Sequence, residues 1–238
     1  MNFRLQWNIK ETLYKQKVIL IGTGKVYRAV YDFLARKKSI KLYGNQGNEI
    51  PFKRIHAINP DLLICACFPK LLPKEIYNKY RCVNFHLGYL PYNRGANPNV
   101  WSIIEKTPPG VTIHNIDGGI DTGKYLVRKK VKTGIEDTAF ILHRKLLDSI
   151  ISLFKDNWEN IKNNRIRAKK YQEKCTFHLR KDFKKLSQID GNKKVKVQDL
   201  IDLLRAKSFT GHPGLHVVIG KNIYDVTINI KKVNQKNK

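Results

Sequence analysis

Residues 17–21 read KVILI and run directly into Gly22-Thr23-Gly24, after which residues 25–38 (KVYRAVYDFLARKK) carry apolar side chains at helical spacing. A short apolar strand, a glycine turn and a helix are the way in which a doubly wound α/β domain begins. This stretch therefore predicts an α/β fold with a Rossmann-like, mostly parallel sheet and flanking helices.

Apolar runs and amphipathic stretches continue to alternate toward the C-terminus. Strands that alternate with helices indicate a mostly parallel sheet with right-handed crossovers. The predicted strands cover residues 39–43, 61–68, 81–86, 111–116 and 124–131, and the predicted helices cover residues 74–80, 98–106 and 136–161.

The composition changes after residue 162. Residues 163–170 (NNRIRAKK) are polar and basic, residues 197–207 form a further amphipathic pattern, and two apolar runs flank Gly220-Lys221-Asn222. The last feature predicts a β-hairpin of residues 215–219 and 223–231. We expect a catalytic core in residues 1–165 and a smaller α+β region in residues 166–238 for substrate binding or dimerisation.

The chain is strongly basic, with 46 Lys and Arg against 19 Asp and Glu and a formal net charge of +27. Its 42 % hydrophobic content excludes a disordered polycation, because such disorder requires low hydrophobicity. The charge raises nucleic acid as a partner. Its diffuse distribution equally fits a compositional bias, with a few cations placed for small anionic ligands.

The cysteines and the N-terminus bear on the compartment. Cys65, Cys67, Cys82 and Cys175 lie in or beside apolar runs without metal-binding spacing, which predicts reduced and mostly buried thiols. Residues 1–17 contain no apolar leader, and no stretch reaches the length of a membrane span. We therefore expect a cytoplasmic protein without membrane contact.

The glycine turn does not predict dinucleotide binding. The third glycine of a GxGxxG pattern would fall at Tyr27, whose bulk conflicts with close packing of the helix on the strand. A GxxxxGK[ST] phosphate loop is also missing from the sequence. A plain strand-to-helix turn is the simpler interpretation.

Two polar clusters carry the candidate chemistry. In residues 84–98 (NFHLGYLPYNRGANP), Asn84 and His86 are two residues apart on one strand, so their side chains share a face. An amide can stabilise an oxyanion and a histidine can accept a proton, although such a pair also occurs as ordinary hydrogen-bonding residues.

The second cluster, residues 113–123 (IHNIDGGIDTG), is a glycine-rich loop between two predicted strands. Its carboxylates, Asp117 and Asp121, could suggest a cation site. The spacing does not match a calcium loop, which needs more acidic positions and a closing glutamate. We predict no metal.

The two clusters together resemble the folate-dependent formyltransferases. The family elements are Asn-x-His, Leu-Pro and Arg-Gly, followed by Gly-Val-Thr and Asp-Thr-Gly, and they stand here in that order within residues 84–98 and 110–123. The resemblance implies transfer of a formyl group from 10-formyltetrahydrofolate to an amine, with Asn84, His86 and Asp121 as catalytic residues. It extends over roughly residues 60–150.

The resemblance also implies binding residues, each of which has a structural alternative as a core side chain or a surface cation. Those implied for the folate co-substrate are Phe68, Pro69, Lys70, Leu71, Asp117 and Ile120. Those implied for the acceptor are Arg94, Gly95, Arg205, Phe209 and Tyr224.

The acceptor is inferred from the C-terminal residues. Residues 174–183 (KCTFHLRKDF) and 204–214 (LRAKSFTGHPG) resemble the segments that follow the core in sugar N-formyltransferases. This implies a dTDP-linked 3- or 4-amino-(di)deoxyhexose as the acceptor and a role in O-antigen or other lipopolysaccharide biosynthesis. The free edge of the terminal hairpin predicts a homodimer. A methionyl-tRNA formyltransferase-like enzyme and a noncatalytic nucleic-acid-binding protein are the alternatives, although we do not expect nucleic acid as a partner.

Overall fold

The computed structural model describes residues 15–233. Its main sheet has six strands in the order β2-β1-β3-β4-β6-β7. The pairs β1–β2, β1–β3 and β3–β4 are parallel, which confirms the predicted Rossmann-like α/β fold. The strands are β1 (Gln16–Gly22), β2 (Ile40–Gln46), β3 (Leu62–Ala66), β4 (Cys82–His86), β6 (Gly110–Asn115) and β7 (Tyr125–Lys130).

Strand β6 departs from the parallel pattern. The backbone N–H of Ile116, just beyond the end of β6, donates to the carbonyl of Cys82 at the start of β4, over 3.0 Å. The end of β6 therefore meets the beginning of β4, and the two strands run in opposite directions. This direction places the middle of β6 beside the middle of β4.

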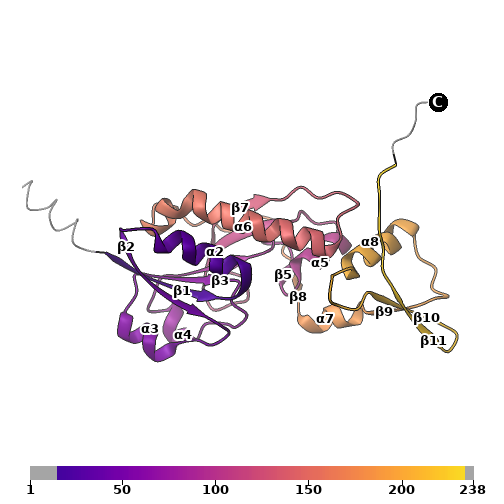
Figure 1. The fold of residues 1–238 in the computed structure, drawn as a ribbon, viewed down its shortest axis with the longest axis horizontal. Helices are drawn as coiled ribbons and strands as arrows, with labels where there is room; N and C mark the ends of the chain where they lie inside the picture. Colours follow the sequence, from indigo (N-terminus) through magenta and orange to yellow (C-terminus); the bar gives the residue numbers. More distant parts are fainter. Residues whose placement is uncertain (1–14, 234–238) are drawn as a thin grey trace, which may run out of the picture. The chain divides into compact units, whose positions relative to one another are not determined.

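Helices cover both faces of the parallel strands. Figure 1 shows α2 (Gly24–Ala35) and the C-terminal part of α6 (Ala139–Lys162) on one face, and α3 (Phe52–Ile58) and α4 (Lys74–Tyr77) on the other. All five residues of β3 are buried between these layers. Burial of such an apolar strand on both faces is what a central parallel strand requires.

The chain divides into two compact units. The first runs to Phe85 and includes Ile113–Val127 and Ile151–Lys170. The second contains His86–Thr112, Arg128–Ile150 and the chain from Tyr171 onward. The predicted division of the chain into a catalytic core of residues 1–165 and a smaller region of residues 166–238 stays a prediction.

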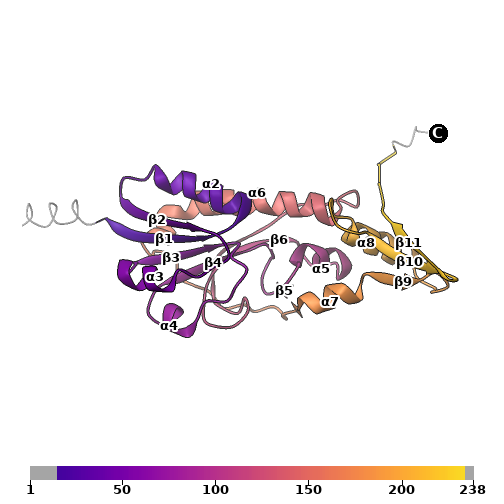
Figure 2. The ribbon, with the colours of Figure 1, turned by 60° about the horizontal axis from the view of Figure 1, so that its bottom comes forward.

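The second unit contains α5 (Pro98–Ile104), α7 (Arg180–Lys185) and α8 (Val197–Lys207), and α8 contacts α5. Figure 2 shows its C-terminal strands together. They are β9 (Gln188–Asp190), β10 (Leu215–Ile219) and β11 (Asn222–Val226), in the order β11-β10-β9. A two-stranded sheet joins β5 (Arg94–Gly95) to β8 (Phe177–His178).

The predicted hairpin is confirmed, but its second strand is shorter than expected. Strand β11 ends at Val226, not at residue 231. The reason is that Val226 is paired with Leu215, the first residue of β10, so β11 has no hydrogen-bonding partner in β10 beyond this point.

The cysteine prediction holds for two positions. Cys65 and Cys82 are buried, Cys67 is half-buried, and Cys175 is exposed. The expectation of mostly buried thiols is therefore wrong for Cys175, which lies outside regular secondary structure. Residues 1–14, on which most of the predicted absence of a leader rests, lie outside the described part. Within residues 15–233, every helix is too short or too polar to cross a membrane.

Candidate active site

Three polar side chains of the first unit converge between β4 and the loop that follows β6. The amide nitrogen of Asn84 lies 3.3 Å from Oδ1 of Asp121 and 3.2 Å from Nε2 of His114. The same Asp121 oxygen lies 3.4 Å from His114 Nε2. Because β6 is antiparallel to β4, His114 stands beside Asn84, and the loop after β6 returns Asp121 to both.

A neighbouring carbonyl determines the protonation of one of the two ring nitrogens of His114. Its Nδ1 lies 2.8 Å from the carbonyl oxygen of Asn115, which can only accept, so Nδ1 carries a proton. Nε2 then either accepts from the Asn84 amide or, when the ring is protonated, donates to Asp121. His114 is 2 % exposed and the Asp121 side chain 11 %, so both groups are largely shielded from water.

Asp121 is held at its place by an unusual backbone conformation. Its φ is +52°, in the left-handed region that aspartate tolerates better than bulkier residues do. The preceding turn is closed by Asp117, whose Oδ1 accepts from the Thr122 hydroxyl over 2.5 Å and from the Gly119 N–H over 3.3 Å. The loop is thus preformed, and Asp117, predicted as a folate contact, has a role within it. Ile120, the other residue predicted from this loop, is half-buried.

His86 is the last residue of β4, two positions after Asn84, so the two side chains leave the strand on the same face. His86 is 6 % exposed and belongs to the second unit. The structure therefore brings Asn84 and Asp121 into contact and places His86 on the same strand as Asn84.

The segment predicted to contact folate connects β3 to α4 in the first unit. Phe68 is half-buried and packs against the core cluster around Ile76 and Tyr80, so its structural alternative has direct support. Pro69, Lys70 and Leu71 are exposed, and Leu71 is 62 % exposed. Exposed apolar and cationic side chains at this position are available to a ligand.

Arg94 and Gly95 form β5 in the second unit. The guanidinium carbon of Arg94 lies 5.6 Å from the ring centre of Phe177, in β8, and the Arg94 Nε is buried without a hydrogen-bond partner among residues 15–233. Phe177 is 40 % exposed. An incompletely bonded guanidinium beside an exposed ring is consistent with the acceptor role predicted for Arg94.

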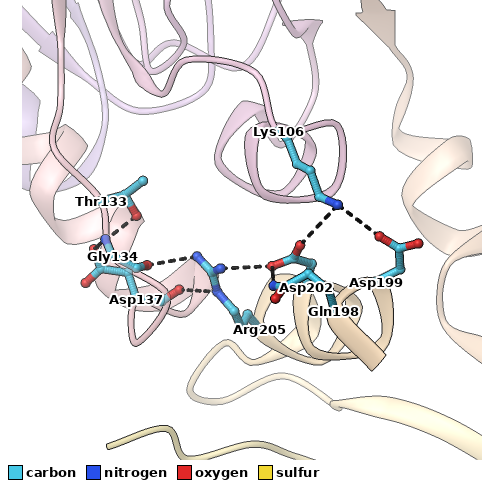
Figure 3. Close-up of polar contacts among 8 residues, drawn as sticks. All are labelled: Lys106, Thr133, Gly134, Asp137, Gln198, Asp199, Asp202 and Arg205. Atoms are coloured by element: carbon cyan, nitrogen blue, oxygen red, sulfur yellow. Dashed lines mark hydrogen bonds and ion pairs between the residues drawn. The ribbon is translucent and has the colours of Figure 1, made fainter. Parts of the chain in front are cut away.

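Arg205 is engaged within the protein, as Figure 3 shows. Its Nε donates to the carbonyl of Asp137 (2.9 Å), Nη1 to Asp202 Oδ1 (2.9 Å) and Nη2 to the carbonyl of Gly134 (3.0 Å). Asp202 also faces Lys106 Nζ at 3.8 Å. These contacts support a structural role for Arg205 in joining α8 to the segment before α6, and its predicted role in acceptor binding stays a prediction.

Phe209 and Tyr224, the remaining residues predicted for the acceptor, lie apart in the second unit. Phe209 packs edge-on against Phe140, with ring centres 5.3 Å apart. Tyr224 lies on β11 and is 49 % exposed. Phe209 thus packs against another half-buried ring, whereas Tyr224 lies on an exposed strand.

Comparison with known families shows the family to which the chain belongs. A family model described as formyl transferase matches residues 18–154, more than half of the chain. The chain belongs to the formyl transferase family. A second model, described as the N-formyltransferase dimerization C-terminal domain, matches residues 182–232.

Individual members of the formyl transferase family resemble the chain over most of its length. The dTDP-4-amino-4,6-dideoxyglucose formyltransferase of Mycobacterium bovis is 31 % identical over 199 residues, which cover 79 % of this chain and 85 % of the relative. A 4-N formyltransferase from Francisella tularensis shares the fold, with a TM-score of 0.82, 23 % identity, and coverage of 92 % of this chain and 99 % of that one.

A third relative was solved with ligands. The formyltransferase PseJ from Anoxybacillus kamchatkensis, in complex with UDP-4,6-dideoxy-4-formamido-L-AltNAc and tetrahydrofolate, is 33 % identical with a TM-score of 0.63. The match covers 71 % of this chain and 88 % of that one. The similarity of this formyl transferase to known families therefore covers residues 18–154 in its core and residues 182–232 in its C-terminal region.

His114 was not predicted as a site residue. It belongs to the glycine-rich cluster, in which the predicted site residues were Asp117, Ile120 and Asp121. His114 lies beside Asn84 because β6 is antiparallel to β4, and the alternating pattern of strands and helices in the sequence does not reveal this direction. The structure also shows no group of three or more His, Cys, Asp or Glu side chains arranged to hold a metal within residues 15–233.

Proposed function

We propose that this formyl transferase transfers the formyl group of 10-formyltetrahydrofolate to the amino group of a dTDP-linked 3- or 4-amino-(di)deoxyhexose. The observation that carries the chemistry is the contact among Asn84, His114 and Asp121, in which an amide, an imidazole and a carboxylate lie within 3.4 Å of one another. This set can stabilise a developing oxyanion and transfer protons.

The proposed reaction is direct transfer of the formyl group. The amine nitrogen attacks the formyl carbon, and the electron pair of the carbonyl bond moves to its oxygen, which the Asn84 amide stabilises by hydrogen bonding. His86 accepts the proton that the amine loses. When the tetrahedral intermediate collapses, the bond to the folate nitrogen breaks, and that nitrogen receives a proton with the help of Asp121.

Two features support folate as the donor. The segment with Pro69, Lys70 and Leu71 offers an exposed cation and exposed apolar surface, and the neighbouring loop of Asp117 is preformed. Phe68 and Ile120 would complete the contacts with the pterin. The relative PseJ, whose structure contains tetrahydrofolate, supports the same donor.

The acceptor is inferred from the C-terminal region and from the relatives. The M. bovis relative is named for a dTDP-linked 4-amino sugar, and this chain covers 85 % of its length. The proposed acceptor contacts are Arg94, Gly95, Arg205, Phe209 and Tyr224. Phosphate groups suit Arg94, because its buried Nε has no hydrogen-bond partner within residues 15–233.

The wider context of the enzyme is also part of the proposal. Its match to a dimerization domain supports a homodimer formed through residues 182–232. We place the enzyme in the cytoplasm, where folate and nucleotide sugars occur together, and its product in O-antigen or related surface polysaccharide. Nucleic acid and membrane are not proposed as partners.

A panel of acceptors tests the proposal. The full-length protein is incubated with 10-formyltetrahydrofolate and, separately, dTDP-4-amino-4,6-dideoxyglucose, a dTDP-linked 3-amino sugar, a UDP-linked 4-amino sugar and methionyl initiator tRNA. Mass spectrometry of each acceptor then detects a formamide. We expect a formylated dTDP sugar and no formylated tRNA, and the His86→Asn variant should lose the activity while remaining folded.

The outcomes separate the alternatives. Formylation of the tRNA instead of any sugar would show a transfer-RNA enzyme. Tight, salt-dependent binding to nucleic acid without any formylation would favour a noncatalytic protein. Full activity in His86→Asn would refute the assignment of the catalytic base while leaving the acceptor assignment intact.

A further inference from the structure

Arg128, in strand β7, makes three contacts within the second unit. Its Nη1 donates to the carbonyl of Leu90 over 2.5 Å, and its Nη2 donates to Glu173 Oε1 over 2.6 Å. The guanidinium carbon also lies 4.5 Å from the ring centre of Tyr89. One rigid, planar cation thus holds two consecutive residues of the loop after His86 and a carboxylate of the connection to α7.

The same loop is held from β6 as well. The Thr112 hydroxyl donates to the carbonyl of Gly88 (2.8 Å) and accepts from the N–H of Leu90 (3.1 Å). The ring of Tyr89 lies so close to Gly110 that a Cβ there would be 3.0 Å from it. Residues 88–90 are therefore fixed on several sides. Lys130 Nζ also lies 5.5 Å from the ring centre of Tyr89, but Arg128 is closer to the ring and in addition donates to the Leu90 carbonyl.

The loop residues pack directly against His86. A Cβ on Gly88 would lie 2.5 Å from Nε2 of His86, so the glycine backbone borders the imidazole. His86 is 6 % exposed. A shift of residues 88–90 by a few tenths of an ångström would consequently change the space available to the His86 ring.

The contact with Glu173 extends this restraint to the acceptor residues. Beyond Glu173, the carbonyl of Thr176 accepts from the N–H of Arg94 over 3.0 Å, and β8 pairs with β5. The Arg128 and Glu173 side chains are only 16 % and 29 % exposed. The hydrogen bond from Arg128 lowers the pKa of Glu173, which keeps this pair ionised at neutral pH.

We propose that Arg128 is a positioning residue for formyl transfer, which holds residues 88–90 against His86 and ties them through Glu173 to the segment that aligns Arg94. This inference rests on the proposed function, because it assumes that His86 acts on the acceptor amine. Lysine would not replace arginine here, since one ammonium lacks the fork that reaches Leu90 and Glu173 together.

Kinetics of matched variants test the role. Arg128→Met, Arg128→Lys and Glu173→Gln are compared with Lys129→Met, which removes an exposed cation from the neighbouring position of β7. We expect Arg128→Met to lower kcat by up to about 100-fold, as for misplaced catalytic groups, with little change in the KM for folate. Arg128→Lys should retain part of the rate, and Lys129→Met should match the wild type.

Two further readouts separate positioning from simple loss of fold. The first is kcat per folate-binding site, titrated with a folate analogue, because misfolded molecules drop out of that ratio. The second is a double-mutant cycle: Glu173→Gln should add little to Arg128→Met, since both remove the same ion pair. An unchanged kcat per folate site in Arg128→Met would overturn the proposal.

Hydrogen exchange distinguishes this inference from the proposed function. In Arg128→Met, the amides of residues 87–94 should exchange faster than in the wild type and in Lys129→Met, whichever acceptor the enzyme uses. Faster exchange in Arg128→Met, found together with a wild-type protein that formylates no amino sugar, would support the restraint and refute the proposed function. Unchanged exchange would refute the restraint itself.

Discussion

His114 Nε2 and Asp121 Oδ1 lie 3.4 Å apart, with the Asn84 amide nitrogen within 3.3 Å of both. Nδ1 of the imidazole donates to the Asn115 carbonyl, so Nε2 is the nitrogen at which the ring can gain or lose a proton. A proton gained there converts a hydrogen-bond acceptor for Asn84 into a cationic donor to Asp121. The three groups therefore form one hydrogen-bonded network.

Removing the Asp121 charge tests this centre. In Asp121→Asn the shape is kept, but the carboxylate can no longer support a proton transfer. We expect kcat to fall roughly 100- to 10,000-fold, the usual range for lost acid–base catalysis. Steady-state formylation kinetics measure the effect, and Asp32→Asn, an exposed residue of α2, serves as the control. Equal rates in the two variants would exclude Asp121 from the chemistry.

His114→Asn tests the neighbour that the sequence analysis did not assign. The variant should lower kcat less than Asp121→Asn does, because Asp121 keeps its contact with Asn84. Since both substitutions disturb one network, the double variant should be hardly slower than Asp121→Asn alone. Fully multiplicative losses would show that His114 acts independently of Asp121.

Arg205 allows its structural and acceptor roles to be distinguished. Substitution by Met removes the guanidinium that donates to the buried carboxylate of Asp202 and to the carbonyls of Gly134 and Asp137, and it leaves Asp202 with its longer contacts to Gln198 and Lys106. Breaking such a buried pair costs about 3–5 kcal/mol, and each kcal/mol lowers Tm by about 2–4 °C in a chain of this size. Thermal unfolding of Arg205→Met should show this loss. A normal Tm with a raised KM for the sugar nucleotide would instead establish the acceptor role.

Asp137 predicts how stability responds to acid. Its burial raises the pKa, but hydrogen bonds from Lys145, Gly134 and Thr133 outweigh this, and the net pKa lies below the ordinary value of 3.8. A carboxyl whose pKa is lower in the folded state stabilises the fold above its unfolded pKa, and this stabilisation is lost as the pH falls through the folded value.

The expected window for this loss is therefore below about pH 4 to 5. Urea midpoints measured between neutral pH and this range should fall less steeply for Asp137→Asn than for the wild type. The Asn variant should also be less stable at neutral pH. Parallel pH curves for the two proteins would contradict the role of Asp137, and Asp32→Asn again supplies an exposed carboxylate control.

The sequence predicted the elements whose local pattern is strong. The apolar run before Gly22 and the long amphipathic helix correspond to β1 and α6, because burial of one strand and one helical face leaves a periodic signal. Strands β5 and β8 have two residues each, so periodicity had too few positions to reveal them.

Part of the candidate site was predictable for the same reason. Asn84 and Asp121 stand in distinctive clusters, and the structure brings them together. The contact of His114 depends on the direction of β6, and Glu173 and Asp137, which are partners of Arg128 and Arg205, lie tens of residues away from them in the chain. A sequence of many lysines and arginines does not show which few are buried and paired, since that is decided by tertiary packing.

The thiols offer a direct test of burial. Burial raises the pKa of both Cys67 and Cys82 to about 12, and it raises that of Cys65 well above its ordinary range. The thiolate is the reactive form, so these residues should resist an aromatic disulfide reagent near neutral pH. We expect Cys175 to react rapidly in the native protein and the other three only after denaturation. Retention of the fast phase in Cys175→Ser would contradict this assignment.

The β10–β11 hairpin provides the test of the proposed homodimer. Ile219 and Ile223 lie at its turn and are 58 % and 61 % exposed, although both are large apolar side chains. Covering such surface with a second copy would stabilise the assembly by about 25 cal/mol for each Å² of apolar area buried. Glutamate at both positions should therefore yield a monomer in light scattering after size exclusion. Val233→Glu, at an 82 % exposed position outside the hairpin, is the matched control. A dimer that persists in the double variant but dissociates in Val233→Glu would place the interface elsewhere.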